Sequence, residues 1–326
     1  MRAWQVHDHG DPAHALAMAE IPPPDTGPGL LRVRVGAAAI GLPDVLMARG
    51  TYPLTPRAPF VPGQEVAGVV VAAGDGARTE VGTRVMGVTD FRDGAGGLAE
   101  EALVLDDFAF AVPVSMNDAD AAGFLIPFHT AHLGLVRRGR LARGETLVVL
   151  GAAGGTGSAA VTLGHALGAT VIAVAGGAAK GSYCRSLGAA HTVDHARGDV
   201  AGAVRELTAD RGADVVYDPV GGEMFDAACR FVANEGRILT VGFAGGGWGT
   251  VSTADVTVRN YSVVGVFAGA YDRELRAEVQ RELLGLWDAG AIRSIVTTSV
   301  PFDDAPALLE SLASRRMMGK AVVTIA

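Results

Sequence analysis

The chain has 326 residues, of which 49% are hydrophobic and 19% charged, and its formal net charge is −8 at pH 7. This length accommodates about two domains with separate cores, and the composition is typical of folded rather than disordered proteins. The acidic balance and the lack of a basic run argue against nucleic acid and against an anionic membrane surface as partners.

Only two cysteines occur, Cys184 and Cys229, which are too few for a disulfide framework and suit a reducing compartment. The first residues contain no signal-peptide core, and no apolar run approaches the length of a membrane span. We therefore expect a cytoplasmic protein without a membrane segment.

Residues 1 to about 120 predict a β-rich region. The segment Leu30–Val35 alternates apolar and charged residues, as a half-exposed strand does, whereas 22–29 is rich in Pro and Gly and indicates turns. Further segments of strand character follow at close spacing, at 64–73, 81–88 and 98–105. Short strands separated by glycine-containing turns are typical of a small barrel.

A helical segment over 119–134 leads to the most informative stretch of the chain. Thr146–Leu150 predicts a buried strand, Gly151–Gly157 a glycine turn and Ser158–Leu167 a helix, and Thr170–Ala175 predicts the next strand. This pattern is a βαβ unit, whose first turn binds a dinucleotide in folds of this kind.

The chemistry of this turn follows from its backbone. Unpaired N–H groups at a helix start attract a pyrophosphate, and glycine lets the backbone approach it. We expect Gly154, Gly155 and Thr156 to contact this group. The fingerprint is modified, because Ala152 stands where G-x-G-x-x-G begins. The alternative is a glycine-rich turn without a ligand, but the flanking strand and helix favour dinucleotide binding.

The end of the second strand indicates which dinucleotide binds. NAD-binding proteins place an acidic residue there for the ribose hydroxyl. This chain continues instead with Gly176 and Gly177, then Lys180, and has no acid before Asp194. A missing carboxylate and an added lysine suit a 2′-phosphate, so the sequence predicts NADP(H) as cofactor, with Gly176 and Lys180 beside it. The alternative for Lys180 is an ordinary surface lysine.

Strands and helices alternate in the next part of the chain, which predicts an α/β fold with a doubly wound parallel sheet. The strands are expected within 187–194 and at 213–218, 236–242 and 262–267, and the helices at 200–208 and 224–232. A helix over 272–289 is followed by a strand, a helix and a strand. We interpret the tail from about 269 as returning to the first domain, which makes the dinucleotide domain an insertion.

Short stretches along the whole chain match one family in its order: 41–44, 50–53, 59–65, 94–100, 130–131, 151–157, 216–222 and 319–323. On these residues the chain resembles the zinc-independent medium-chain dehydrogenase/reductases of the quinone oxidoreductase (zeta-crystallin-like) type. The resemblance implies a GroES-like β-barrel catalytic domain of residues 1–120 and 269–326. It also implies an inserted NADP-binding Rossmann domain of residues 121–268, with the catalytic cleft between the domains.

The activity implied by the resemblance is NADPH-dependent reduction of quinones or α,β-unsaturated carbonyls, usually in a homodimer whose sheets join near 263–267. In such a reduction, hydrogen-bond donors stabilise the oxygen that becomes an enolate or phenolate. The protein holds the reacting carbons in contact in a dry cleft.

Zinc-dependent relatives differ from this chain at the positions of their ligands. They carry a Cys near position 41, a Gly-His-Glu at 63–65 and a lobe with four cysteines. Here no thiol lies near Gly41, Gln64 replaces the His, and 91–97 fills the region of the lobe. Because catalytic zinc needs three N, S or O ligands and structural zinc usually four cysteines, we expect no metal site.

The resemblance also suggests residues of the catalytic site. Tyr52 matches a tyrosine that hydrogen-bonds the substrate carbonyl, and its alternative is a turn tyrosine packed beside Pro53. Asp44 matches a family aspartate, for which capping of a helix is the favoured alternative. Leu42 is expected to line the nicotinamide pocket, whereas Gly41 replaces a frequent family Asn and removes one polar contact.

The remaining candidates lie around the cofactor. Thr130 matches a hydroxyl near the nicotinamide, whereas we interpret the flanking His129 and His132 as ordinary helix residues. Lys180 and His195 match positions near the 2′-phosphate. Further contacts are expected at the carboxyl edge of the sheet and in the last loop, from Gly242, Phe243, Ala244, Val266, Phe267 and Lys320. Capping of the final strand is the alternative for Lys320.

Two other functions stay open. An enoyl-thioester reductase would need a basic groove for a phosphopantetheine or CoA arm, which the arginines between 137 and 143 would supply unless they only cover a helix end. A non-enzymatic nucleotide-binding protein, like the lens crystallins of this family, would bind NADPH without turnover.

Overall fold

The computed structural model describes residues 1–325, which divide into two units, each with its own sheet. Unit 1 comprises Met1–Ile126, Asp272–Ala277 and the chain from Ser294 onward, and unit 2 comprises Pro127–Tyr271 and Glu278–Arg293. The predicted fold class, a β-barrel with an inserted doubly wound parallel sheet, is confirmed.

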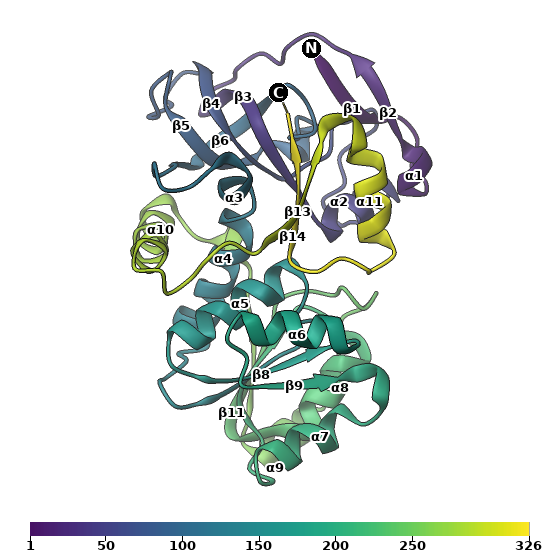
Figure 1. Ribbon diagram of the computed structural model, residues 1–326, viewed down its shortest axis with the longest axis vertical. Coiled ribbons are helices and arrows are strands. Elements are labelled where there is room, and N and C mark those ends of the chain that lie inside the picture. Colours follow the sequence, from purple (N-terminus) through teal and green to yellow (C-terminus); the bar gives the residue numbers. More distant parts are fainter. Residues whose placement is uncertain (326) are drawn as a thin grey trace. The chain divides into compact units, whose positions relative to one another are not determined.

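The strands of unit 1 span Arg2–Val6 (β1), Leu16–Glu20 (β2), Leu30–Ile40 (β3), Glu65–Ala73 (β4), Arg84–Thr89 (β5), Glu101–Ala111 (β6), Val296–Pro301 (β13) and Lys320–Thr324 (β14). Six of them form one sheet in the order β13-β14-β3-β4-β5-β6 (Figure 1). A further antiparallel pairing of β3 with β6 closes four of these strands into a barrel. The remaining two, β1 and β2, form a separate antiparallel pair.

Strand β3 shows how the sequence builds the core of this barrel. Leu31, Val33 and Val35 are buried, whereas Arg32 and Arg34 between them reach the surface. This alternation places the apolar side chains on the inner face, because successive side chains of a strand point to opposite faces. Burial of each aliphatic side chain contributes roughly 1.5–3 kcal/mol. The predicted half-exposed strand is confirmed.

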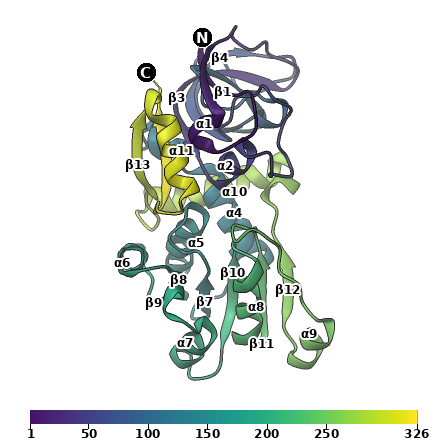
Figure 2. The same ribbon diagram turned by 90° about the vertical axis from the view of Figure 1, so that its right-hand side faces the viewer.

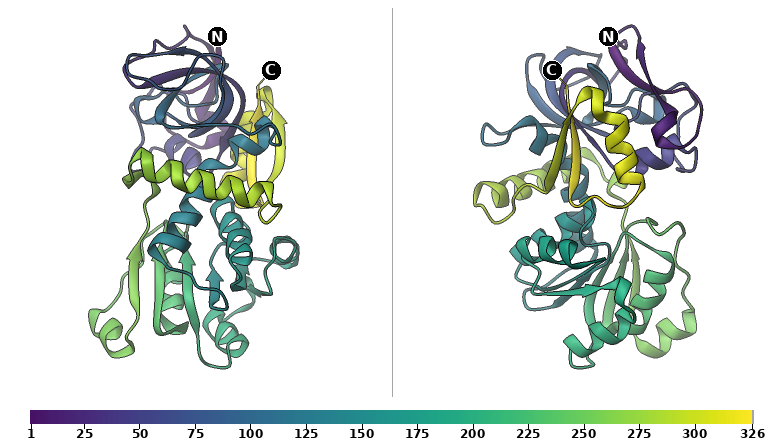
Figure 3. Two further views of the ribbon diagram at one scale, coloured as in Figure 1. Left: turned by 90° about the vertical axis from the view of Figure 1, so that its left-hand side faces the viewer. Right: turned by 45° about the vertical axis from the view of Figure 1, so that its right-hand side comes forward.

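The helices of unit 1 are short and span Pro12–Ala15 (α1), Leu42–Ala48 (α2), Asp118–Ala122 (α3) and Ala305–Ala313 (α11). Helix α11 packs against α1, α2 and β13, and Figure 3 shows it in yellow with the C-terminal strands. The longer helix α10 (Arg273–Asp288) has its first residues in unit 1 and its remainder in unit 2.

Strand β6 differs from the strand predicted at 98–105, because it begins at Glu101 and continues to Ala111. Two aspartates, Asp106 and Asp107, lie in its middle, where acidic residues are uncommon. The first of them is buried, with only 2% of its surface exposed. A buried carboxylate persists only when partners satisfy it.

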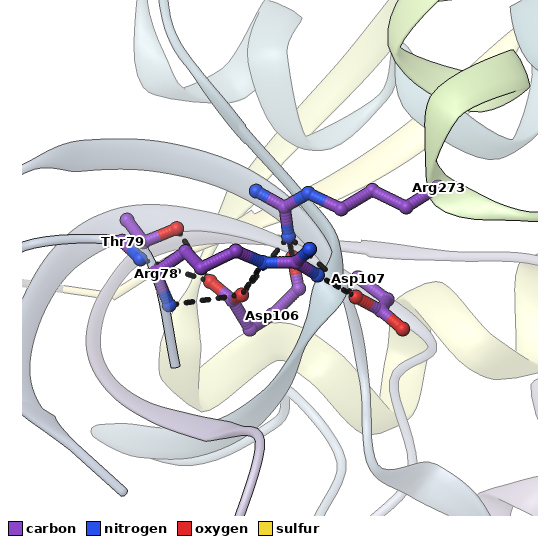
Figure 4. A network of polar contacts seen from close by, with 5 residues as sticks. All are labelled: Arg78, Thr79, Asp106, Asp107 and Arg273. Atoms are coloured by element: carbon purple, nitrogen blue, oxygen red, sulfur yellow. Dashed lines mark hydrogen bonds and ion pairs between the residues drawn. The ribbon is translucent and has the colours of Figure 1, made fainter. Parts of the chain in front are cut away.

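Those partners come from distant parts of the sequence (Figure 4). The backbone N–H and hydroxyl of Thr79 donate to Asp106 Oδ1 over 3.1 and 2.6 Å. Arg273 at the start of α10 places its guanidinium 2.9 Å from Asp106 Oδ2. Arg78 reaches both Asp106 and Asp107. The cluster fixes the first turn of α10 to the barrel.

The strands of unit 2 span Thr146–Val149 (β7), Thr170–Ala175 (β8), His191–Asp194 (β9), Ala213–Asp218 (β10), Val232–Thr240 (β11) and Ser262–Gly265 (β12). They form a fully parallel sheet in the order β12-β11-β10-β7-β8-β9, and Figure 2 shows β7 to β12 in this order. The strand order reverses between β7 and β10. Ligands of such sheets bind at the carboxyl ends of the strands beside this reversal.

The helices of unit 2 include α5 (Gly155–Ala166), α6 (Ala178–Ser186), α7 (Val200–Leu207), α8 (Gly222–Phe231) and α9 (Thr253–Arg259). The helical segment predicted over 119–134 is divided into α3, α4 (Leu125–His132) and a π-helical segment, Leu133–Arg138. Helix α9 was not predicted. None of its residues is buried, so it lacks the apolar face that hydrophobic periodicity detects.

The burial of β7 explains why the strands of unit 2 are continuous apolar runs in the sequence. Leu147, Val148 and Val149 of β7 are each fully buried, as expected for a parallel sheet covered on both faces.

In the described part of the chain, the helices are all too short or too polar to cross a membrane.

Candidate active site

The turn between β7 and α5 is shaped by glycines that leave no room for side chains. Gly151 has a φ of 56°, a left-handed conformation that suits glycine. A Cβ at Gly157 would lie 2.3 Å from the Gly151 carbonyl oxygen and 2.8 Å from Ala152 Cα. Helix α5 therefore starts in direct contact with the strand end, and only glycine fits at this contact.

Helix α5 begins at Gly155, three residues before the predicted Ser158, with Gly154 as its N-cap. No side chain caps this end, so the first-turn N–H groups are left for an external acceptor. Together with the positive end of the helix dipole, they fit an anionic group such as a pyrophosphate. The contacts predicted for Gly154, Gly155 and Thr156 stay predictions, and the local geometry is compatible with them.

Two predicted cofactor residues lie together, Gly176 directly after β8 and His195 directly after β9. A Cβ at Gly176 would lie 3.0 Å from His195 Nε2, so the backbone passes directly beside the imidazole. Lys180 lies in the first turn of α6 and is partly buried. The ends of β8 and β9 thus place these three candidates on one edge of the sheet.

Asp194 and Arg197 lie at the same edge and were missed by the sequence analysis. Asp194 Oδ1 accepts hydrogen bonds from the N–H groups of Gly177 and Ala196, both over 3.0 Å, and its Oδ2 lies 3.3 Å from Arg197 Nε. The two N–H donors lower the pKa of Asp194. The carboxylate is therefore engaged within its own turn. Nothing in the sequence around Asp194 indicated this.

A cavity of about 520 Å³ opens at this edge. It lies against the ends of β8 and β9 and against α6 and α7, and its lining includes Ala175, Gly177, Thr192, Asp194 and Arg197. The cavity therefore adjoins the residues predicted at the adenosine end of the cofactor.

The loop after β11 folds back on the loop after β10. The Gly242 N–H donates to the carbonyl of Asp218 over 3.3 Å, and the Ala244 N–H donates to that of Pro219 over 3.1 Å. A Cβ at Gly242 would lie 3.1 Å from the Pro219 carbonyl oxygen. These contacts hold the predicted segment from Gly242 to Ala244 at the carboxyl edge of the sheet.

Aromatic side chains gather on the loop after β11 and on the segment after β12. The ring of Phe243 packs on Trp248 with 4.8 Å between centroids, and Trp248, which was not predicted, is 62% exposed. Past β12, the Val266 N–H donates to the Thr240 carbonyl over 3.0 Å and its side chain is buried. Phe267 is 60% exposed.

Helix α4 carries Thr130 between two buried histidines. His129 Nε2 lies 2.7 Å from Gln280 Oε1, and His132 Nε2 lies 2.7 Å from Glu282 Oε2. Both histidines are thus engaged by α10, and Thr130 is partly buried. These contacts agree with the interpretation of the histidines as helix residues that hold α4 in place.

In unit 1, Asp44 is buried and binds two loops at once. Its Oδ2 accepts from the Gly41 N–H and its Oδ1 from the Gly63 N–H, each over 2.8 Å. Burial raises the pKa of Asp44 to about 6, against the lowering effect of these N–H groups and of Lys320. The carboxylate caps α2 and fixes the segment that precedes β4.

Lys320 and Glu65 form a buried ion pair next to this aspartate. Lys320 Nζ lies 2.5 Å from Glu65 Oε1, and the side chains are 11% and 2% exposed. The other oxygen of Glu65 accepts from the Ile126 N–H over 2.8 Å. The pair joins β14 to β4, and the predicted contact of Lys320 with a cofactor phosphate stays a prediction.

Tyr52 lies on a turn after α2, where it packs on the barrel core together with Leu42. Burial raises the pKa of Tyr52, and the side-chain amide of Gln64 acts against this rise. Gln64 is itself 8% exposed. Unit 1 therefore brings together Asp44, Tyr52 and Lys320 of the predicted set and adds Gln64 and Glu65, which the sequence analysis did not single out as site residues.

Residues 1–325 contain no group of three or more His, Cys, Asp or Glu side chains arranged to hold a metal ion. Apart from Thr130 on α4, the predicted site residues of unit 2 gather in two places. The first is the edge formed by β8 and β9 with the glycine turn, and the second is the loop after β11 with the start of the segment after β12.

Two protein-family models match this chain. Residues 27–114 match the alcohol dehydrogenase GroES-like domain, and residues 155–284 match the zinc-binding dehydrogenase domain. The chain is also 35% identical to quinone oxidoreductase-like protein 2 of Rattus norvegicus, over 79% of this chain and 73% of that protein.

Solved structures agree over the whole length. A mycobacterial protein solved in complex with NADPH has a TM-score of 0.90 and 28% identity, with 99% of each chain covered. The quinone oxidoreductase of Escherichia coli, also solved with NADPH, has a TM-score of 0.90 and 25% identity, with 99% of this chain and 100% of that chain covered. The resemblance drawn from the sequence is confirmed: this chain belongs to the medium-chain dehydrogenase/reductase family of oxidoreductases, among its quinone oxidoreductase-like members.

Proposed function

We propose that this protein binds NADP(H) and reduces quinones or α,β-unsaturated carbonyls by hydride transfer without a metal. The observation that carries the proposal is the uncapped start of α5, where glycines leave the first-turn N–H groups to an external anion. Two relatives of the same fold were solved with NADPH, which supports the choice of cofactor.

The residues of unit 2 divide between the two halves of the cofactor. Gly154, Gly155 and Thr156 bind the pyrophosphate through backbone N–H groups. Gly176, Lys180 and His195 hold the adenosine end, where Lys180 supplies the positive charge that a 2′-phosphate requires. Asp194 does not oppose this phosphate strongly, because its carboxylate is already bonded by two N–H groups and faces Arg197.

The nicotinamide half takes the remaining candidates. We assign it to the glycine loop after β11, to the segment after β12 and to two residues elsewhere, as the set Leu42, Thr130, Gly242, Phe243, Ala244, Val266 and Phe267. Lys320 contacts a phosphate of the cofactor. When bound, the nicotinamide supplies the hydride.

Tyr52 is the proposed catalytic residue of unit 1. Its hydroxyl donates a hydrogen bond to the substrate oxygen and stabilises the charge that develops there. Burial keeps the phenol protonated at neutral pH, because it raises the pKa of Tyr52 above the ordinary value of about 10. Asp44 supports this site by accepting hydrogen bonds from the N–H groups of Gly41 and Gly63, which fixes both segments.

Three further proposals concern the whole protein. Unit 1 acts as the catalytic domain and unit 2 as the NADP-binding domain, and the protein works in the cytoplasm. It forms a homodimer through β12, an edge strand of its sheet. Val263 in this strand and Phe267 just after it are 38% and 60% exposed.

The test is consumption of NADPH by the purified protein with 1,4-benzoquinone and with a simple enone. We expect turnover with both substrate classes, faster with NADPH than with NADH, and no stoichiometric zinc in metal analysis. NADPH binding without turnover across quinones, enones and enoyl thioesters would favour the non-enzymatic function. Turnover with enoyl thioesters alone would favour the thioester reductase.

The thioester reductase has less support from the structure. Arg138 Nε donates to the Gly265 carbonyl over 3.0 Å, and the guanidinium of Arg137 lies 5.7 Å from the centroid of the Tyr271 ring. Both side chains therefore have partners within unit 2.

A further inference from the structure

Trp248 on the loop after β11 is a large aromatic residue that the fold leaves mostly uncovered. Its side chain packs on the ring of Phe243, with 4.8 Å between the ring centroids and 43° between the ring planes. Phe243 is partly buried, whereas Trp248 is 62% exposed. An aromatic ring supported by a second ring offers a rigid apolar surface, and such surfaces line sites for small organic ligands.

The backbone on both sides of Trp248 is fixed to unit 2. Before the indole, the Gly246 N–H donates to the Phe243 carbonyl over 2.8 Å, which closes the turn that brings the two rings together. After the indole, Gly249 lies against the buried ring of Phe225, with no room for a Cβ between them. The loop therefore presents the indole in one place, and the exposed ring is a fixed part of the surface.

The loop of Trp248 lies on the side of the sheet that suits the nicotinamide half of the cofactor. The strand order reverses between β7 and β10, and a dinucleotide lies across such a reversal. The candidates for the adenosine half follow β8 and β9 on one side of it, whereas Trp248 follows β11 on the other side. A hydride acceptor reacts in contact with the nicotinamide, so it binds on the side of Trp248 as well.

The loop around Trp248 is neutral. No residue between Thr240 and Asp255 carries a charge, and five of those after Val241 are glycines. A negatively charged acceptor would require a cation in its site. The loop therefore suits an uncharged, flat acceptor that gains affinity from apolar contact.

We infer that Trp248 is a specificity-determining residue whose indole, supported by Phe243, stacks on the ring system of the acceptor. The inference names fused-ring quinones, such as naphthoquinones, as the favoured substrates within the proposed function, on which it rests. Stacking removes apolar area of both rings from water, and the gain grows with that area. A second fused ring supplies this area, whereas benzoquinone and an open-chain enone lack it.

The first measurement is tryptophan fluorescence, because a quinone in contact with an indole quenches its emission. The chain has three tryptophans, so the difference between wild type and Trp248→Phe isolates the emission of Trp248. With NADP⁺ present in place of NADPH, 1,4-naphthoquinone should quench this emission along a saturable curve. The emission that remains in Trp248→Phe should fall only in proportion to the concentration of the quinone. Quenching of Trp248 that does not saturate would overturn the inference.

The second measurement is kinetic. Trp248→Ala should raise the KM for 1,4-naphthoquinone about tenfold and change the KM for a simple enone less than about twofold. Trp248→Phe keeps an aromatic ring and should restore most of the loss. Val258→Ala, at a 79% exposed position on α9, is the matched control and should alter neither KM. An equal rise of KM for both substrates in Trp248→Ala would contradict a role in selecting fused rings.

The affinity for NADPH separates the acceptor from the cofactor as the ligand of this ring. Calorimetric titration of Trp248→Ala should give an unchanged Kd for NADPH. A Kd raised as much as the KM for naphthoquinone would place the indole on the nicotinamide instead and would refute the inference.

These measurements also distinguish the inference from the proposed function. If neither quinones nor enones are turned over, the proposed function fails, while saturable quenching of Trp248 by naphthoquinone still supports a site for fused rings. If turnover is normal and Trp248→Ala has no selective effect on naphthoquinone, the proposed function stands and the role of Trp248 is refuted.

Discussion

The two units hold their candidate site residues by opposite means. In unit 1, buried polar side chains bind one another and the backbone, as Asp44 binds two loops and Lys320 binds Glu65. In unit 2, the key positions are glycines, and the groups left for a ligand are backbone N–H groups at the start of α5.

The two kinds of site therefore respond differently to substitution. A site made of paired side chains depends on every partner, because a charge that loses its partner stays buried. A site made of bare backbone accepts a small side chain where a glycine has free space, as at Gly154, but it then loses the space that a ligand needs. Substitutions in unit 1 should therefore reduce stability first, and a substitution at Gly154 in the turn of unit 2 should reduce binding first.

The largest expected effect is on stability in unit 1. Glu65→Gln removes the charge that balances the buried ammonium of Lys320 and should lower the free energy of unfolding by about 3–5 kcal/mol. The measurement is urea unfolding followed by far-UV circular dichroism. Glu100→Gln is the matched control, since Glu100 pairs with Arg2 at the surface, and it should cost less than about 1 kcal/mol. Similar losses in the two variants would contradict the comparison.

The corresponding change in unit 2 is Gly154→Ala. Its Cβ would lie 3.4 Å from the nearest atom, the Gly151 carbonyl oxygen, and its φ of −81° is open to any residue. We expect an unchanged melting temperature and an NADPH affinity reduced about 10- to 100-fold, which corresponds to about 1.4–2.7 kcal/mol. Calorimetric titration measures the affinity.

Gly285→Ala, in the exposed part of α10 with nothing within 4 Å of its Cβ, is the control for Gly154→Ala. It should leave the affinity for NADPH intact. Normal affinity in Gly154→Ala would remove this residue from the pyrophosphate site.

The charge of Lys180, beyond the end of β8, should affect only the preference for NADPH over NADH. Lys180→Ala should raise the KM for NADPH about tenfold and leave that for NADH unchanged, because only NADPH carries the 2′-phosphate. Arg205→Ala, an exposed cation on α7, is the control and should alter neither value. An equal effect of Lys180→Ala on both cofactors would exclude the lysine from the phosphate site.

The smallest effect is the pH dependence of unit 1. Because burial raises the pKa of Asp44 to about 6, the folded state binds this proton more tightly than the unfolded state does. The resulting contribution to stability is complete below the unfolded pKa of about 3.9 and is lost as the pH rises through 6. Relative to Asp44→Asn, the wild-type protein should lose about 1 kcal/mol between pH 5 and pH 7.5.

Urea unfolding of both proteins at several pH values measures this loss. A difference between them that is constant over this range would show that Asp44 has an ordinary pKa.

The sequence was most informative where structure follows from local pattern. Strands β8 and β10 have the predicted bounds, because short apolar runs between turns describe a buried parallel strand well. Strand β6 was placed too early, because Asp106 looks like a strand end until its distant partner Arg273 is known. Helix α9 was missed for a different reason. It is exposed, so it has no apolar face that a hydrophobic pattern would detect.

The same distinction applies to the candidate site. The glycine turn is a local motif, so its residues were found directly. The pair of Lys320 and Glu65 joins residues 255 positions apart, and Asp44 binds the N–H of Gly63, which lies 19 positions further along the chain. Pairings of this kind are created by tertiary structure, and no spacing in the sequence reports them.

The strand order of unit 1 has a consequence for biosynthesis. Strand β14 lies between β13 and β3, so residues 320–324 are required in the interior of a sheet whose strands β3 to β6 are made before any strand of unit 2. During translation, the barrel must wait for this segment with one edge of β3 uncovered, whereas unit 2 has all its strands as soon as β12 leaves the ribosome. Unit 2 can therefore mature first, and chaperone dependence should concentrate on the barrel.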